Sequence, residues 1–224
     1  RLASTNKVVW FTQPIYDTDG ITINTSVTPY LNWKGSGSIG ARENGQFGDA
    51  NVIRLRAGSN TNFITIDGNV SFNVKGLAFN ANKANQANTF DAFVVKGTSS
   101  YYSGVLQDVH VNYSKRDGLL NESRPQVYVL DSGFGFNNGA GVRLNGAVDN
   151  IINNVVTGKN LDDGLVASNF TTLRITKLDS FENLGNGIQL IGNSFSTWAY
   201  LKDCVVNVNG KDGIKVVGNV GLST

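Results

Sequence analysis

The chain has 224 residues, of which 40% are hydrophobic and 16% charged, a composition that can bury a core and argues against disorder. Its net charge of +2 and the lack of any run of Lys or Arg argue against a nucleic-acid-binding protein. No stretch approaches the ~20 apolar residues that a membrane-spanning helix needs, and the single cysteine excludes an internal disulfide.

In chain order, the sequence divides by the regularity of its pattern. Residues 1–50 show no repeat, and we expect them to form an irregular first coil or an N-terminal cap. Residues 51–224 are predicted to form one repetitive β domain, less regular over 51–90 and regular over 91–218. The many Asn and Gly residues, with only 3 prolines, favour frequent tight turns.

The regular part repeats a short motif, in which a small or polar residue is followed by Gly and an apolar residue. The motif glycines are Gly118, Gly141, Gly164, Gly187 and Gly213, spaced 23, 23, 23 and 26 residues apart. Four residues before them stand Ser114, Asn137, Asn160, Asn183 and Asn209. A period of this length is the mark of a repeat architecture.

Each period contains short strands with alternating apolar residues, and no segment has a helical period long enough to connect parallel strands. Stacked coils solve this problem, because each strand pairs with its equivalent one period later, ~4.8 Å along the axis. The sequence therefore predicts an all-β parallel β-helix, a solenoid with coils of about 23 residues. The asparagine column would form a ladder of side-chain amides.

The chain stops six residues after Gly218, with no helix to cover the last coil. Exposed strand edges are normally capped or paired. We therefore expect the β-helix to continue beyond residue 224 or to be capped by another subunit.

The repeat resembles the right-handed, single-stranded parallel β-helices of the pectate-lyase-like superfamily. The upstream segments "VTPYLNWKGSGS" and "ITIDGNVSFNVKGLAFNANK" resemble the opening coils of such proteins, and of phage tailspikes in particular. The resemblance implies an extracellular or virion-tail protein, often a homotrimer, that binds a bacterial surface glycan or uronic-acid polymer and in some cases cleaves it. Two alternatives stay open: a stand-alone secreted lyase or polygalacturonase-like hydrolase, and a non-catalytic structural fibre.

Candidate catalytic residues are carboxylates at the turn before the repeated strand. Asp117 and Asp163 are two periods apart, about 9.6 Å along the axis, close to the ~6.5–9.5 Å separation in inverting glycosidases. Asp162 lies beside Asp163 and could form an acid and base pair with it. Asp before Gly is also an ordinary turn former, but the turn does not require Asp162, whose column otherwise holds Arg or Lys and Gly.

Candidate substrate-binding residues lie on the strand after that turn. Arg143 projects from the coil between Asp117 and Asp163, and Gln189, Lys215 and Glu122 share the outward face. The two coils of 26 residues carry aromatic insertions, with Tyr101 and Tyr102 in one and Trp198 in the other; these are expected to form walls that stack on sugars or to fold back onto the coil.

The resemblance supports no complete mechanism. Asp162-Asp163 matches the Asp-Asp element of polygalacturonases, but His110 lacks the flanking glycines of their Gly-His-Gly, and Arg174-Ile175 is not followed by Lys. We interpret His110 as an exposed strand residue and Lys159 with Glu182 as a surface ion pair. No calcium cluster, zinc spacing or nucleotide loop is evident, so neither a metal nor a cofactor is expected.

Overall fold

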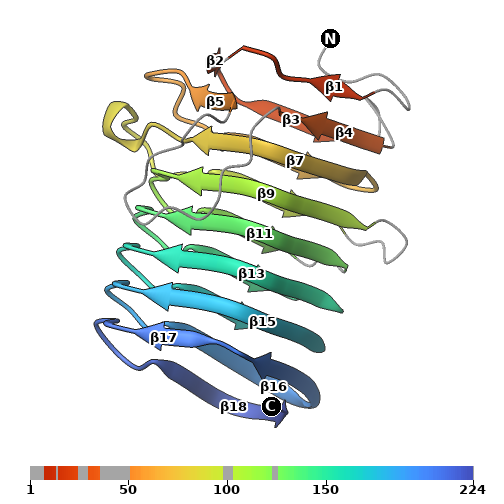
Figure 1. Cartoon of the computed structure of the whole chain (residues 1–224), viewed down its shortest axis with the longest axis vertical. Helices are drawn as coiled ribbons and strands as arrows, with labels where there is room; N and C mark the ends of the chain where they lie inside the picture. Colours follow the sequence, from red (N-terminus) through yellow and green to blue (C-terminus); the bar gives the residue numbers. More distant parts are fainter. Residues whose placement is uncertain are drawn as a thin grey trace.

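The computed structural model describes residues 8–13, 15–24, 30–35, 51–97, 103–122 and 126–223, without the side chains of 193–196. These residues form 18 β-strands and one short 3-10 helix, η1 (Lys83–Asn85). In Figure 1 the strands in front run to the left, and the chain returns behind them and descends, which is the sense of a right-handed coil. Neighbouring strands pair in parallel throughout. The predicted fold class, a parallel β-helix, is confirmed.

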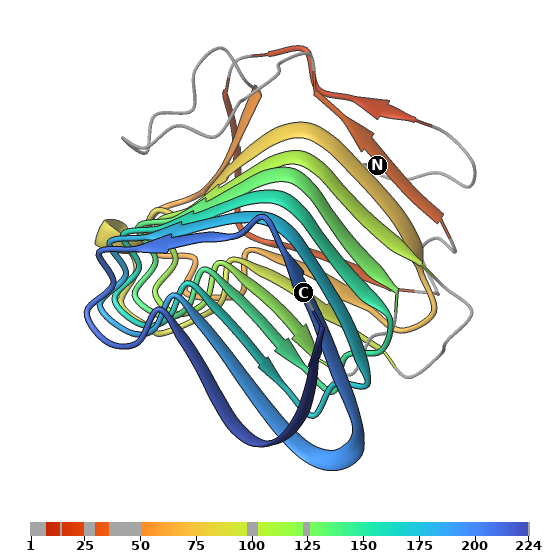
Figure 2. The ribbon, with the colours of Figure 1, turned by 60° about the horizontal axis from the view of Figure 1, so that its bottom comes forward.

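Three parallel sheets surround one core (Figure 2). Sheet 1 contains β3 (Ile21–Asn24), β6 (Ile64–Asp67), β8 (Phe93–Lys96), β10 (Leu119–Glu122), β12 (Val142–Asn145), β14 (Leu165–Ser168) and the first parts of β16 (Ile188–Lys202) and β18 (Ile214–Ser223). Sheet 2 contains β1 (Val9–Trp10), β4 (Tyr30–Lys34), the second parts of β16 and β18, and the first halves of β7 (Ser71–Asn80), β9 (Gly104–Asn112), β11 (Val127–Gly135), β13 (Asn150–Gly158) and β15 (Thr172–Phe181). Sheet 3 contains β2 (Ile15–Thr18), β5 (Asn51–Leu55), β17 (Val205–Asn207) and the second halves of β7, β9, β11, β13 and β15.

The register of sheet 1 gives the coil length directly. Leu119, Val142, Leu165 and Ile188 lie opposite one another, so the regular coils have 23 residues, as predicted. The coils on either side are 26 residues long, and a register shift between Asn193 and Trp198 shows where the later one holds its extra residues. The predicted insertion of the coil that contains Trp198 is therefore confirmed.

Sheets 2 and 3 meet at a corner made by one residue per coil. Asp108, Asp131, Asn154 and Lys177 occupy this position with φ between 51° and 53°, in the left-handed region. Asp and Asn enter that region more readily than most residues. One such residue turns the strand without a loop, which is why β9, β11, β13 and β15 each contribute to two sheets.

Inward side chains of the three sheets stack in columns along the axis. Leu119, Val142, Leu165 and Ile188 are fully buried, and alternate residues of the same strands face outward. Near the N-terminal end the column is aromatic, where Phe79 packs edge-to-face on Phe63 and on Phe93. The outward column of sheet 1 is mixed: Thr65, Val94, Leu120 and Val166 are at most 8% exposed, whereas Arg143 and Gln189 are half-buried polar residues.

The predicted asparagine ladder is present at the corner between sheets 3 and 1. Amide Nδ2 of Asn137 donates to Oδ1 of Asn160 (3.0 Å), Asn160 to Asn183 (2.8 Å) and Asn183 to Asn209 (3.0 Å). Each Nδ2 also donates to a main-chain carbonyl, as that of Asn160 does to Phe134 (3.2 Å). The ladder therefore satisfies buried polar groups from coil to coil.

Two expectations about single residues have opposite outcomes. Lys159 and Glu182 form the predicted ion pair, at 3.7 Å. The prediction for His110 is wrong: it is 3% exposed, because Gly133 on the next coil has no side chain and the imidazole lies over it. The 23-residue period already places Gly133 opposite His110, so the burial could have been predicted from the missing side chain of that glycine.

The strands of residues 9–34 continue the stack upward, since β2, β3 and β4 pair with β5, β6 and β7. The domain boundary at residue 50, and a cap or continuation of the chain after residue 224, stay predictions.

Candidate functional site

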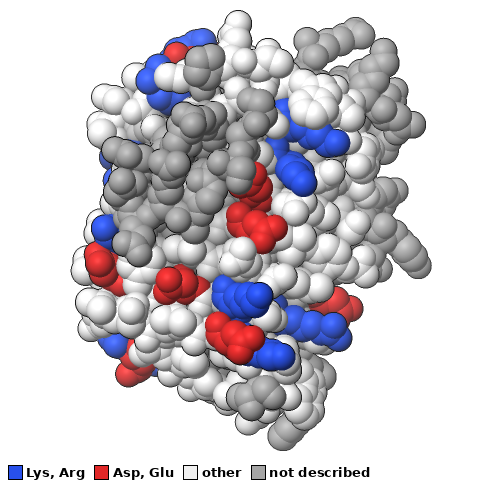
Figure 3. Space-filling view, in the orientation of Figure 1, with Lys and Arg blue, Asp and Glu red and all other residues white. Residues whose placement is uncertain are grey.

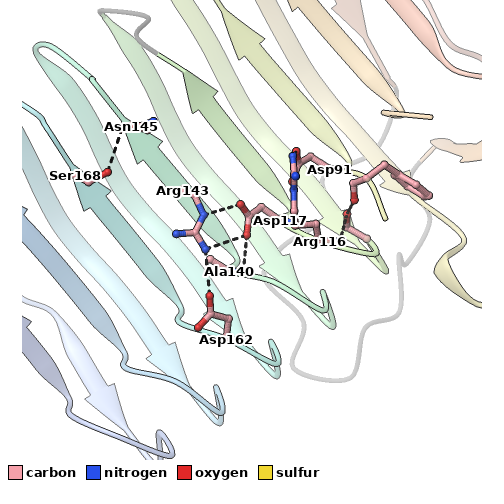
Figure 4. A network of polar contacts seen from close by, with 10 residues as sticks. Asp91, Arg116, Asp117, Ala140, Arg143, Asn145, Asp162 and Ser168 are labelled. Carbon is pink, nitrogen blue, oxygen red and sulfur yellow. Dashed lines mark hydrogen bonds and ion pairs between the residues drawn. The ribbon is translucent and has the colours of Figure 1, made fainter. Parts of the chain in front are cut away.

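The candidate carboxylates gather at the corner between sheets 3 and 1, which we call the acid corner (Figure 4). Its innermost column contains Asp91, Asp117, Ala140, Asp163 and Asn186, one residue per coil. Asp91, Asp117 and Asp163 are at most 3% exposed. Oδ1 of Asp91 accepts the main-chain N–H of Asp117 (3.0 Å), and Oδ1 of Asp117 accepts that of Ala140 (2.7 Å). Asp163 accepts the N–H of Asn186 in the same way, so these carboxylates close the backbone of the turn.

Two arginines bind this column from outside. Arg116 binds both carboxylate oxygens of Asp91, with Nε 2.7 Å from Oδ1. Arg143 binds both oxygens of Asp117, with Nε 2.6 Å from Oδ2 and Nη2 3.3 Å from Oδ1. The same Nη2 donates to Oδ2 of Asp162 at 3.1 Å. Asp91 and Asp117 thus each anchor one arginine (Figure 4), and the side chains of Arg116 and Arg143 are 52% and 31% exposed.

The electrostatics of the two arginines reflect these contacts. Burial alone would lower the pKa of Arg143, but the hydrogen bonds and charges of Asp117 and Asp162 outweigh it and raise the pKa above its ordinary value. The hydrogen bond that Arg116 donates to Asp91 is the main cause of the raised pKa of Arg116, and the charge of Glu122 adds an attraction. Both guanidiniums are therefore permanent cations held between acids.

The adjacent aspartates Asp162 and Asp163 have different partners. Asp163 is buried and accepts Nδ2 of Asn186 at 2.9 Å. Asp162 is 44% exposed and binds Arg143 on the outer side. The structure thus brings Asp162 together with Asp117, through one guanidinium nitrogen, while Asp163 serves the turn. The catalytic roles predicted for the three aspartates stay predictions.

The other residues predicted on sheet 1 lie in the expected register. Arg143, Gln189 and Lys215 belong to one outward column, in which Val166 separates Arg143 from Gln189. Glu122 lies opposite Asn145 and is exposed. Their binding roles stay predictions.

The aromatic walls are placed differently from one another. Trp198 pairs with Thr172 and so begins the sheet 2 part of β16, round the corner from Gln189. It is 56% exposed. Tyr101 and Tyr102 lie outside the described residues.

Asp91 and Arg116 belong to the site but were not predicted. A signal was available, because Asp91 lies 26 residues before Asp117 in the same column and Arg116 stands in the column of Asp162. Side chains of opposite charge in neighbouring columns of a solenoid lie close enough to form ion pairs. Considering each residue by itself does not reveal these pairs.

Within the described ranges, no group of three or more His, Cys, Asp or Glu side chains is arranged to hold a metal ion. No helix in the same ranges is long and apolar enough to cross a membrane.

Comparisons with known proteins agree with the fold. No protein-family model matches the sequence, and no curated protein matches it. Among solved structures, the chain is similar to pectate lyase Pel9A, with a TM-score of 0.50 and 16% identity, over 73% of this chain and 47% of that one. It is also similar to tailspike protein 2 of bacteriophage CBA120 (TM-score 0.47, 14% identity, 97% and 42% of the two chains) and to the A-module of the Azotobacter vinelandii mannuronan C-5 epimerase AlgE4 (0.44, 12%, 97% and 91%). The chain spans about half the length of the pectate lyase, and the likeness establishes a pectate-lyase-like β-helix fold.

Proposed function

We propose that this protein binds polysaccharide on the outer face of sheet 1, beside the acid corner. The observation that carries the proposal is the Asp117–Arg143–Asp162 cluster. A buried aspartate orients an arginine, and that arginine holds an exposed carboxylate at its side. A turn that needed only a closed backbone would not require Arg143 or Asp162. In the turn of Asp163, the side-chain amide of Asn186, and not an arginine, donates to the carboxylate.

The cluster offers donors and acceptors side by side, which is what sugar hydroxyls bind. Within the described part of the chain, the bonds of Arg143 use Nε and Nη2 and leave the two N–H groups of Nη1 for a ligand. The bond of Asp162 uses Oδ2, which leaves Oδ1 as an acceptor. Gln189 lies further along the same column of sheet 1 and extends the polar surface.

The charge of the site favours a neutral glycan. Four carboxylates, those of Asp91, Asp117, Glu122 and Asp162, surround the guanidiniums of Arg116 and Arg143. The formal balance is four negative charges against two positive ones. A uronic-acid polymer would be repelled, whereas an uncharged stretch of a surface glycan would not.

Cleavage of the bound polymer is a further part of this proposal, and Asp162 is the carboxylate best placed for it. Asp117 and Asp163 are buried and occupied by hydrogen bonds, so we assign them the positioning of Arg143 and of the turn. Hydrolysis by a single carboxylate is incomplete, because glycosidases use two. Glu122 is a second exposed acid of this surface, and its charge acts on Arg116.

We also propose that the protein is tailspike-like: a homotrimer, extracellular or on a virion tail, that recognises a host surface glycan. Lyases, epimerases and fibres share this fold, so the fold is compatible with a tailspike but does not distinguish it from them. A trimer mass in solution would favour it, and a monomer that releases reducing sugar would favour the stand-alone enzyme.

The test is a glycan screen with three forms of the protein. Wild type, Asp162→Asn and the control Asp67→Asn are titrated with neutral and acidic bacterial glycans, pectin and alginate. Asp67 is a matched control because it is an exposed carboxylate on sheet 1 paired with Lys96 at 3.3 Å, away from the acid corner. We expect Asp162→Asn to bind a neutral glycan about tenfold more weakly or worse, with Asp67→Asn unchanged.

Product analysis separates the chemical alternatives. New reducing ends without unsaturated uronate indicate a hydrolase, and unsaturated uronate indicates a lyase. Equal binding by all three forms would overturn the site. No binding of any glycan would leave the structural fibre as the function.

A further inference from the structure

Arg174 differs from the other arginines that the structure describes. Arg54, Arg56, Arg116 and Arg143 each bind an aspartate carboxylate. Arg174 is exposed on the outer face of sheet 2. Among the described residues, no carboxylate lies within ion-pair distance of it. An exposed guanidinium without a partner has five N–H donors available to a ligand.

Arg174 lines a groove on that face, with a volume of about 360 Å³. The register places the side chains of the groove in two rows along the stack. The lining residues are Gln126, Tyr128, Asp149, Asn150, Ile151, Thr172 and Arg174. Tyr128 and Arg174 stand two coils apart in one row, ~9.6 Å along the axis, with Ile151 between them.

The next coil extends both rows with aromatic side chains. Trp198 pairs with Thr172, and Tyr200 pairs with Arg174. A Cβ on Gly221 would come within 2.8 Å of three ring atoms of Trp198, so the indole lies against this glycine. With 56% of the residue exposed, Trp198 presents a flat apolar platform to solvent.

We propose that this face of sheet 2 is a second saccharide-binding site, specific for a glycan that carries a carboxylate. Arg174 binds the carboxylate in a bidentate manner, and Trp198 and Tyr128 stack on sugar rings. Asp149 and Gln126 bind hydroxyl groups. The glycan lies along the stack, because the rows of side chains run in that direction.

Charge distinguishes this site from the acid corner. The groove is lined by one cation, Arg174, and one acid, Asp149, and Lys202 stands two residues beyond Tyr200 on the neighbouring strand, whereas the acid corner holds more acids than cations. Figure 3 shows basic and acidic side chains side by side over the later coils of this side of the molecule. The two sites lie on different sheets, so this inference does not rest on the proposed function of sheet 1.

The experiment is a titration of the whole chain with oligogalacturonate, and with a dextran oligosaccharide as the neutral probe. Wild type is compared with Arg174→Ala, Trp198→Ala, Arg56→Ala and Asp162→Asn. Arg56 is the matched control, because it is an exposed arginine already paired with Asp19. We expect Arg174→Ala and Trp198→Ala each to weaken oligogalacturonate binding by tenfold or more, with little change in Arg56→Ala.

Three results would overturn the inference: no binding of oligogalacturonate by wild type, equal affinity of Arg174→Ala and Arg56→Ala, or equal binding of the neutral probe. A fall in oligomer mass on Arg174→Ala in sedimentation would assign the face to contacts between copies of the chain instead. Loss of binding in Asp162→Asn alone would return the ligand to the acid corner.

Discussion

Two columns of polar side chains run along the same corner, and they solve the same problem in different ways. In the asparagine ladder, each amide both donates to the next coil and accepts from the one before, so the column is neutral and needs no other partner. In the acid corner, Asp91 and Asp117 can only accept, and they draw Arg116 and Arg143 from outside to supply donors. The uniform column stabilises the coil. The mixed column also creates a polar site at the surface.

The ladder should carry the larger stability effect. Asn160→Ala removes the bonds to Asn137, Asn183 and the carbonyl of Phe134, and leaves buried partners unsatisfied. We expect the free energy of unfolding to fall by about 3–5 kcal/mol, measured by urea denaturation. Glycan affinity of the folded protein should not change.

Asn145→Ala is the matched control for this prediction. Asn145 is exposed, and its Oδ1 accepts from Ser168 (3.3 Å) and Asn169 (3.1 Å). Its loss should change stability by less than about 0.5 kcal/mol. A similar loss in both variants would mean that burial does not distinguish the ladder from surface amides.

The difference between the columns also explains what the sequence could predict. A period of 23 residues and a repeated Asn determine the stack, the register and the ladder, because each identical residue must meet its copy. The acid corner was found only in part: Asp162 stood out from the repeat, and Asp117 and Arg143 were named as candidates, but their pairing depends on side-chain reach between columns. The groove on sheet 2 was not predicted: Trp198 was expected to stack on sugars, but Tyr128 and Arg174, which lie two periods apart in one column, were not recognised as its neighbours.

The acid corner should respond to Asp117→Ala with a smaller loss of stability and a loss of function. The substitution leaves Arg143 half-buried without its main partner and the N–H of Ala140 without its acceptor. Because Arg143 is 31% exposed, solvent screens part of the effect, and we expect about 2 kcal/mol. Binding of a neutral glycan should also weaken. Unchanged binding would show that Arg143 can bind the glycan without being oriented by Asp117.

Ala140→Asn would make the acid corner more like the ladder. Asn186 follows Asp163 by one coil, just as Ala140 follows Asp117 by one coil. Nδ2 of Asn186 donates to Oδ1 of Asp163. An amide at 140 should donate to Asp117 in the same way and compete with Arg143. We expect a stability change of less than about 1 kcal/mol in calorimetry, with weaker glycan binding. A large loss of stability would mean that the space beside Asp117 is fully occupied by Arg143.

The smallest effect is expected where an arginine and an aspartate pair on the open surface. Arg54 and Asp17 are 43% and 42% exposed and lie 2.7 Å apart. The hydrogen bond from Arg54 lowers the pKa of Asp17 below its ordinary value of 3.8, so at acid pH the unfolded chain binds the proton first. The pair therefore contributes stability above that value, and the contribution is lost as the pH falls through the lower, folded pKa.

Asp17→Asn should cost under about 0.5 kcal/mol near neutral pH, and the difference from wild type should vanish in strong acid. If Asp17→Asn cost as much as Asp117→Ala, the buried column of the acid corner would contribute nothing beyond an ordinary surface ion pair.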